Sequence, residues 1–419
     1  MKAAAIGFLT RLWGTVNHWN YVANQLGEKG AFIHDNVEES VPKGYNVVVY
    51  RTSSHPGYFT YDGVDVCGTR VAVEILDEAN RLNVEGVSKV TKISVTGYSL
   101  GGVIARYAVG LLHKKRFFED IEPVTFTTFC TPHVGTRVLG SGHAVGLFNS
   151  IGTYALSSTS QQLFLKDNYH ASGVPLLQHM SDPKSIYYQA LAKFSKRVSY
   201  ANTEGDNRCA YYTAAFDRQD PFDGRGKFLQ GPYALGYEPT VLDSSEGIFQ
   251  FSDAAQSQKN LSFGSKLVRF GKTTIKRVIA LFKVIVVVPV WFVAFLINAT
   301  YQHILSVGRV KKFRTTVYDE WEHGSGPTFE ERLEDQADVV VDTVYKSLSK
   351  HNESTLKLSP VQQSIIDGLN ALEWHKYPIH ITLHPHVHAA AIVRYKHERF
   401  EEGKVVVRHW IEEGLIECW

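Results

Sequence analysis

The chain has 419 residues, of which 44% are hydrophobic, and its formal net charge is +2. This length predicts two to three domains, or one large α/β domain with an insertion. The balanced charge argues against a general nucleic-acid binder, which needs surplus Lys and Arg to neutralise phosphates. The four cysteines form no C-x-x-C pair and the N-terminal residues carry no secretory cleavage site. We therefore expect a reducing, intracellular compartment, with no disulfide framework and no zinc site.

Short apolar strands alternate with helix-compatible segments through the first half of the chain. This spacing predicts a largely parallel sheet flanked by helices, which is an α/β fold. Residues 141–194 are apolar, aromatic and Ser-rich, and we expect them to form a helical cap over the sheet. Strands are predicted at 4–9, 45–51, 90–96, 124–130 and 197–202, and helices at 19–26, 71–82 and 103–108.

The second half continues this pattern after a polar turn and a loop-like stretch at 217–236. Amphipathic helices are predicted at 330–349 and at 360–374, where Ser359 and Pro360 form a helix start. A strand at 377–383 and a helical region at 405–413 close the chain. The predicted organisation is a hydrolase core at 1–245, an insertion at 246–315 and a second part of the core at 316–419.

The stretch Gly97-Tyr98-Ser99-Leu100-Gly101 reads G-x-S-x-G between a predicted strand and a predicted helix. That context is the nucleophile elbow of an α/β-hydrolase, a strained turn that exposes a serine hydroxyl. Glycines two residues before and after the serine suit such a turn because they lack a Cβ. The N–H of Leu100, near the helix N-terminus, is a candidate oxyanion donor.

A serine nucleophile needs a base and an orienting acid, which follow it in the order Ser, Asp or Glu, His. Asp206 is the favoured acid because it lies in the turn directly after the 197–202 strand; Asp217, Asp220 and Asp223 are its competitors. For the base, His386 and His388 follow the last predicted strand. Two residues apart in an extended segment, they would point the same way, and spacing does not choose between them. Since no third metal ligand has suitable spacing, we expect neither metal nor cofactor.

One segment departs from the pattern of a water-soluble hydrolase. Residues 278–297 are apolar except for Lys283, and cations flank both sides. Its uninterrupted part, 284–297, would span only about 21 Å as a helix against about 30 Å of hydrocarbon. The alternatives are a buried core helix and a membrane-associated segment. The basic flanks favour the membrane, because anionic lipid surfaces attract such clusters.

Several motifs together give the chain a family resemblance that spans most of its length. It resembles the serine esterase/lipase family of α/β-hydrolases that includes fungal lipid-droplet phospholipases. The matching pieces are Leu12-Trp13-Gly14, residues 59–68, Gly97–Gly102, Thr131-Pro132-His133-Val134-Gly135, Tyr200-Ala201-Asn202, Asp206, Tyr211-Tyr212-Thr213, and His386–Ala390 before Ile392-Val393-Arg394.

The resemblance implies a Ser99 nucleophile, an Asp206 acid and a His388 base, with the N–H groups of Leu100 and Leu12 as oxyanion donors. Two departures from the family pattern stand out. Thr10 and Arg11 replace the family's His-Gly before Leu12, as if an earlier first strand were missing. Cys209-Ala210 replaces Val-Pro in a turn.

The resemblance implies an enzyme that hydrolyses acyl esters of lipids, glycerophospholipid ahead of triacylglycerol, at a cytoplasm-facing lipid-droplet or endoplasmic reticulum surface. A single membrane crossing by 278–297 would separate Ser99 and Asp206 from His388. The segment must therefore lie at the interface, re-enter, or pack against protein. The alternatives are an inactive lipase-like interaction protein, which the replacements before Leu12 motivate, and an acyltransferase or thioesterase with the same triad.

Overall fold

The structure is a computed structural model that describes most of the chain. The described residues are 2–9, 15–34, 46–84, 89–136, 149, 157–169, 173–222, 225, 228–245, 247–252, 288–316 and 356–415. The helix predicted at 330–349 and the part of the 278–297 segment before Val288 lie outside them.

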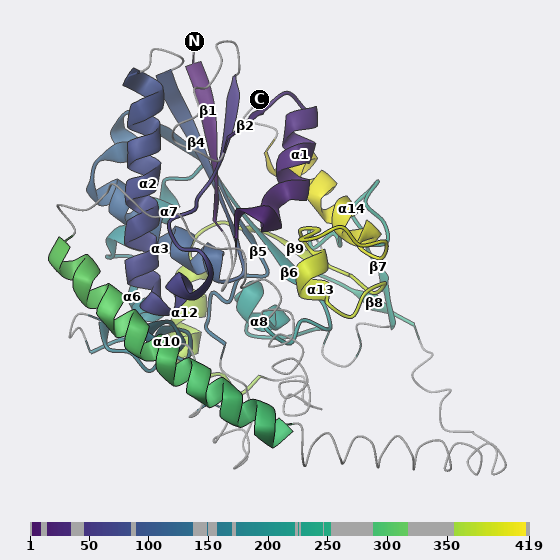
Figure 1. The fold of residues 1–419 in the computed structure, drawn as a ribbon. Coiled ribbons are helices and arrows are strands. Elements are labelled where there is room, and N and C mark those ends of the chain that lie inside the picture. The colour runs from purple at the N-terminus through teal and green to yellow at the C-terminus, as the bar shows by residue number, and fades with distance from the viewer. Residues whose placement is uncertain are drawn as a thin grey trace.

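A seven-stranded parallel sheet forms the centre of the molecule, in the order β2-β3-β1-β4-β5-β6-β9 (Figure 1). Every strand pair in it is parallel, as the alternating pattern predicts, and the predicted α/β-hydrolase fold class is confirmed. The strands are β1 Lys2–Leu9, β2 Phe32–His34, β3 Val47–Arg51, β4 Lys89–Tyr98, β5 Glu122–Phe129, β6 Lys196–Asn202 and β9 His375–Ile379.

Helices cover both faces of this sheet and create two hydrophobic cores. Residues of α1 (Asn20–Glu28) and α14 (Glu401–His409) pack on one face, and those of α2 (Val64–Val84), α3 (Leu100–Lys114), α7 (Ile186–Ala192) and α12 (Pro360–Asn370) on the other (Figure 1). Successive side chains of a strand point to opposite faces. Accordingly, Val47 and Val49 of β3 join the first core and Val48 joins the second.

The strands differ from the sequence predictions in three places. The three-residue β2 was not predicted, because so short a strand has too few residues for a periodic signal. The last strand is not 377–383 but His375–Ile379, an edge strand, where Pro378 is tolerated. The first strand begins at Lys2, two residues before its predicted start, and pairs with both β3 and β4.

The helices also extend beyond, or fall short of, their predicted bounds. Helix α2 begins at Val64, seven residues before the predicted start, directly after the 3-10 helix η2 (Gly57–Asp62). The Ser359–Pro360 start is confirmed, because Ser359 and Gln362 form a reciprocal capping box. The C-terminal region is α14 followed by a π-helical turn, Trp410–Gly414.

The described parts of the predicted cap contain α5 (Ser157–Leu163), α6 (Leu176–His179) and α7. The stretch predicted as loop includes β7 (Leu229–Gly231), which pairs antiparallel with β8 (Gln250–Phe251). Strand β9 returns to the central sheet beside β6 after the insertion. The domain bounds given above stay a prediction.

Helix α10 (Val288–Thr316) lies apart from the sheet and packs on η2 and α5. It runs along the lower edge of the molecule in Figure 1. Of the helices that the structure describes, none combines the length and the apolar character needed to cross a membrane.

Candidate active site

Ser99 occupies the sharp turn between β4 and α3. Its backbone has φ 56° and ψ −130°, a conformation that costs free energy and persists only where the surroundings enforce it. The Ser99 N–H donates to the Phe129 carbonyl of β5 at 2.8 Å. A Cβ on Gly97 would lie 2.4 Å from the Gly102 Cα, so the turn closes only with glycine there. This is the nucleophile elbow that the G-x-S-x-G motif predicts.

Asp206 lies in the turn after β6, as predicted, with its side chain 1% exposed. Its Oδ2 accepts from the Asn202 Nδ2 at 2.8 Å, and its Oδ1 accepts from the Cys209 N–H at 3.0 Å. Burial raises the pKa of Asp206, but His388 and these donors outweigh it and bring the pKa below its usual value. Asp206 is therefore a carboxylate held ionised inside the protein.

The competing aspartates serve local turns instead. Asp217 accepts from the Gln219 N–H at 3.1 Å, and Asp220 accepts from the Phe222 N–H at 3.0 Å. Asp223 lies outside the described residues.

His388 lies between the serine and the acid. Its Nδ1 is 2.7 Å from Asp206 Oδ2, and its Nε2 is 2.9 Å from Ser99 Oγ. Because a carboxylate only accepts, Nδ1 carries the proton, and Nε2 of the neutral ring accepts from the serine hydroxyl. The Tyr98 hydroxyl donates to the His388 carbonyl at 2.9 Å, and the two rings are in contact with their centroids 5.0 Å apart. The three predicted residues thus form one connected chain of hydrogen bonds.

His386 has a different environment, and the expectation of an extended segment is wrong. The stretch begins the short helix α13 (Val387–Ala390), with His386 as its N-cap residue. The ring of His386 packs against that of His384, at a centroid distance of 5.3 Å. Since the backbone turns between them, the two histidines do not point the same way.

Cys130 and Asn202 are neighbours of the acid that sequence reasoning did not assign to the site. The Asn202 Nδ2 bridges the Cys130 Sγ at 3.1 Å and the Asp206 Oδ2. Burial raises the pKa of the Cys130 thiol well above its usual value, and the charge of Asp206 adds to the effect. The sequence could have indicated these two residues only by their positions at strand ends. Cys130 directly follows β5 and Asn202 ends β6, and the carboxyl ends of these adjacent parallel strands meet at one edge of the sheet.

Ligand atoms of Cys130, Asp206 and His388 lie within 4.8 Å of one another, a spacing that a metal ion could use. However, the His388 Nδ1 and the Asp206 Oδ2 are joined by their hydrogen bond, and the buried thiol is protonated. Metal ligation requires thiolate sulfur and an unprotonated imidazole nitrogen. The group therefore suits proton transfer better than metal binding.

Of the two predicted oxyanion donors, the structure describes one. Leu100 is the first residue of α3, and its N–H belongs to the helix N-terminus beside Ser99. Leu12, together with Thr10 and Arg11, lies outside the described residues. The role of Leu12 stays a prediction.

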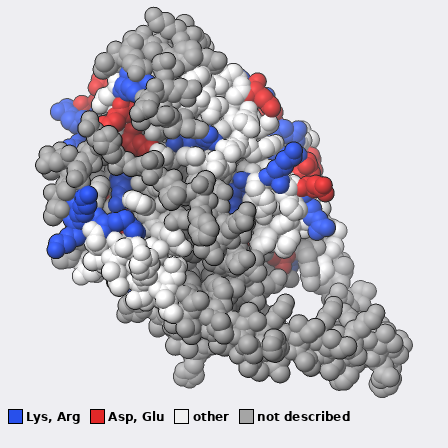
Figure 2. All heavy atoms as spheres, viewed as in Figure 1, with Lys and Arg blue, Asp and Glu red and all other residues white. Residues whose placement is uncertain are grey.

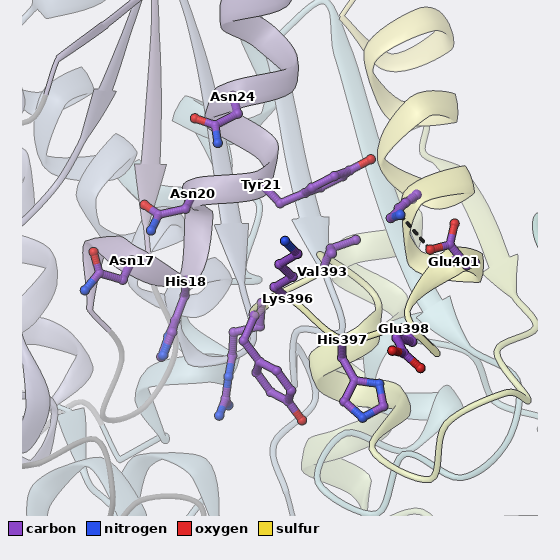
Figure 3. Close-up of a pocket in the computed structure, with 13 residues that line it drawn as sticks. Asn17, His18, Asn20, Tyr21, Asn24, Val393, Lys396, His397, Glu398 and Glu401 are labelled. Atoms are coloured by element: carbon purple, nitrogen blue, oxygen red, sulfur yellow. Dashed lines mark hydrogen bonds and ion pairs between the residues drawn. The ribbon is translucent and has the colours of Figure 1, made fainter.

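A cavity of about 1150 Å³ lies between the start of α1 and the loop after α13 (Figure 3). Asn17, Asn20 and Tyr21 line it from one side, and Lys396 and His397 line it from the other. None of its lining residues is Ser99, Asp206 or His388.

Known proteins resemble this chain in sequence. It is 27% identical over 262 residues to "Putative lipase C4A8.10" of Schizosaccharomyces pombe, covering 59% of this chain and 33% of the relative. It is 30% identical over 180 residues to "Putative lipase ROG1" of Saccharomyces cerevisiae, covering 42% and 23%. The chain thus spans about a third or less of the length of these curated relatives.

Among solved structures, the phospholipase PlaB of Legionella pneumophila, in complex with thio-NAD, aligns with 12% identity and a TM-score of 0.32, over 51% of this chain and 44% of that one. The fold assignment therefore rests on the parallel sheet of this chain and not on this likeness. The sequence profile of the family described as "Putative serine esterase (DUF676)" matches residues 8–217, half of the chain, including Ser99 and Asp206. The chain therefore belongs to this serine esterase family, as its motifs predict.

Proposed function

We propose that this protein is a serine hydrolase that cleaves acyl esters of lipids through an acyl-enzyme. The observation that carries the proposal is the pair of hydrogen bonds from one imidazole, at 2.9 Å to Ser99 Oγ and 2.7 Å to Asp206 Oδ2. Membership in the serine esterase family and the likeness to yeast proteins named lipases support it.

In the proposed reaction, Ser99 Oγ attacks the ester carbonyl while His388 Nε2 takes the hydroxyl proton. Asp206 holds the imidazole in the required tautomer and stabilises its protonated form. The tetrahedral oxyanion is held by the N–H of Leu100 and, by family resemblance, that of Leu12. His388 then protonates the leaving alcohol, and water hydrolyses the acyl-enzyme by the same steps in reverse order.

We propose a lipid as the acyl donor, with glycerophospholipid ahead of triacylglycerol, because the family resemblance leans toward phospholipases. The proposed location is the cytoplasm-facing surface of a lipid droplet or the endoplasmic reticulum. Apolar residues 278–297 with cationic flanks, and the free thiols of Cys67, Cys130 and Cys209, support this location.

The geometry also limits how such a segment can meet a membrane. Ser99 and Asp206 precede residues 278–297 and His388 follows them, yet the three side chains are in hydrogen-bond contact. One crossing of the bilayer would place them on opposite sides. An interfacial segment, lying along the lipid surface, is compatible with the site.

The test is labelling with a fluorophosphonate, which reacts with an activated serine, on wild type and Ser99→Ala. We expect wild type to be labelled and Ser99→Ala to be unlabelled while remaining folded. Absence of labelling in wild type would support an inactive, lipase-like protein instead. Incubation with phosphatidylcholine vesicles should release free fatty acid; transfer of the acyl group to an added alcohol or thiol without fatty acid release would identify an acyltransferase.

A further inference from the structure

The described part of helix α10 exposes several large apolar side chains. Five large apolar side chains of its described part are exposed, between 39% and 67%: Ile297, Tyr301, Ile304, Leu305 and Val307. The first four are spaced by four, three and one residues, so they share one face of the helix. In a helix that packs on a water-soluble protein, that face would be polar.

The opposite face of α10 carries the polar contacts with the protein. Ser306 is fully buried, and its hydroxyl donates to the Asp62 Oδ1 at 2.8 Å. The Arg309 guanidinium donates from Nη2 to the same oxygen at 2.9 Å and from Nε to the Asp62 Oδ2 at 3.2 Å. Closer to the N-terminus of α10, His303 Nδ1 and the Ser157 hydroxyl of α5 are 2.9 Å apart.

These contacts hold the helix in one rotational orientation. The Asp62 side chain is fully buried and is also paired with Arg70 of α2 at 2.9 Å. Arg70 and Arg309 both contact the Phe59 ring, at 5.2 and 5.0 Å from its centroid. Turning the apolar face of α10 inward would separate Arg309 from Asp62 and leave buried charge uncompensated, which is strongly unfavourable.

The outward face belongs to the end of the molecule that holds the candidate active site. Element η2 follows the carboxyl end of β3, and Ser99 follows the carboxyl end of β4, which lies beyond β1 in the same parallel sheet. In Figure 1, α10 runs along the lower edge of the molecule, and α8 (Tyr211–Ala214) and α13 also lie in its lower half. A flat surface against α10 would therefore also face this end.

We propose that the outward face of α10, defined by Ile297, Tyr301, Ile304 and Leu305, lies on a lipid surface. No Asp, Glu, Lys or Arg occurs from 284 to 308, so the face continues an apolar stretch of sequence. Lys311 and Lys312 lie seven residues after Ile304 and Leu305, on the same side of the helix, where anionic head groups would attract them.

Charge distinguishes lipid from a second copy of the chain as the occupant. Helix α10 contains the cations Arg309, Lys311, Lys312 and Arg314 and no acidic residue. Two such faces packed together would offer no carboxylate of α10 to oppose these cations. Figure 2 shows the described part of the helix as white surface with blue cations at its C-terminal end. An anionic lipid surface offers both an apolar interior and the complementary charge.

The inference rests on the proposed function for its substrate, because a lipid surface against α10 presents lipid esters to the end that holds Ser99. Binding of α10 to a lipid surface does not itself require catalysis. Co-flotation of the full chain with phosphatidylcholine vesicles containing phosphatidylserine measures binding directly, while fluorophosphonate labelling measures the site. The two proposals can therefore fail independently.

The variant Ile297→Gln with Ile304→Gln removes two exposed apolar side chains from the face. Its matched control is Leu235→Gln with Ile248→Gln, which changes two exposed apolar residues outside α10. We expect the first variant to lower the vesicle partition coefficient roughly tenfold or more, and the control to leave it unchanged. Fluorophosphonate labelling and thermal unfolding should be unchanged in both variants.

The variant Lys311→Ala with Lys312→Ala tests the charge. It should weaken binding to phosphatidylserine vesicles about fivefold per lysine and leave binding to pure phosphatidylcholine vesicles nearly unchanged. Equal flotation of the α10 variant and its control would overturn the proposal. So would a wild-type dimer, seen by light scattering, that becomes monomeric in the Ile297→Gln, Ile304→Gln variant, since a second copy would then occupy the face.

Discussion

Two aspartates are buried in different regions of this protein, and their partners differ in kind. Asp206, in the candidate active site, is bonded to a neutral imidazole, an amide and backbone N–H groups. Asp62, beneath α10, is bonded to two guanidinium groups and a hydroxyl. Both side chains are at most 1% exposed. Burial alone therefore does not distinguish a reactive carboxylate from a structural one.

The distinction lies in whether the carboxylate's charge is already neutralised. Arg70 and Arg309 are permanent cations, so the charge of Asp62 is matched at all times and fastens α10 to η2. Within the described part of the chain, no Arg or Lys forms an ion pair with Asp206, so its charge is available for the imidazolium that forms when His388 takes a proton. The first arrangement is suited to holding a helix, and the second to catalysis.

The largest expected effect concerns the imidazole that Asp206 orients. His388→Ala should lower ester hydrolysis by about 10⁴-fold or more, because Ser99 then loses its base. His386→Ala is the matched control and should change the rate by less than about threefold, since its ring packs on His384. Initial rates on a soluble short-chain ester provide the measurement. Retained activity in His388→Ala with loss in His386→Ala would reverse the assignment.

The second effect concerns Asp62. Asp62→Asn removes the charge that Arg70 and Arg309 share, and the free energy of unfolding should fall by about 3–4 kcal/mol. Asp367→Asn makes the same chemical change in the exposed pair with Arg218 and should cost less than about 0.5 kcal/mol. Urea unfolding compares the two variants. Equal stabilities would show that the contact beneath α10 contributes no more than a surface ion pair.

His409 adds a buried ionisable group whose hydrogen-bond partner is neutral. Its Nδ1 accepts from the Tyr200 hydroxyl at 2.7 Å, and burial, aided by Lys196, lowers its pKa to about 4. The unfolded chain binds the proton near pH 6.5, so stability falls as the pH drops from about 6.5 to 4, by about 3 kcal/mol for this group. Urea unfolding across this range should show a shallower acid decline in His409→Gln. Parallel curves for variant and wild type would contradict the prediction.

The smallest effect concerns the amide that holds Asp206. Asn202→Ala should lower kcat about ten- to a hundredfold with little change in KM, because Asp206 loses a donor that positions it. Asn370→Ala removes a similar bond, to the Phe216 carbonyl, in a different part of the structure and should leave kcat unchanged. A change in KM alone would show that Asn202 affects substrate binding rather than the triad.

Much of the fold and the site could be predicted from local sequence. The strand–glycine–helix pattern around Ser99 is a local signal, because the sharp turn accepts only residues without a Cβ beside it. Chain order then pointed to Asp206 after a strand and to a C-terminal histidine. The family resemblance selected His388, and the structure brings it to Ser99 and Asp206. The three-residue strand β2 and the early start of α2 left no periodic signal strong enough to find.

By itself the sequence determined the parallel α/β sheet, the elbow at Ser99 and the existence of an apolar segment with cationic flanks. Only the tertiary structure decided which imidazole meets the serine, that Asn202 and Cys130 border the acid, and which face of α10 points outward. The physical reason is the range of the interactions. Turns and periodicity act over a few residues, whereas Asp62 and Arg309, or Ser99 and His388, are joined across more than two hundred residues of chain.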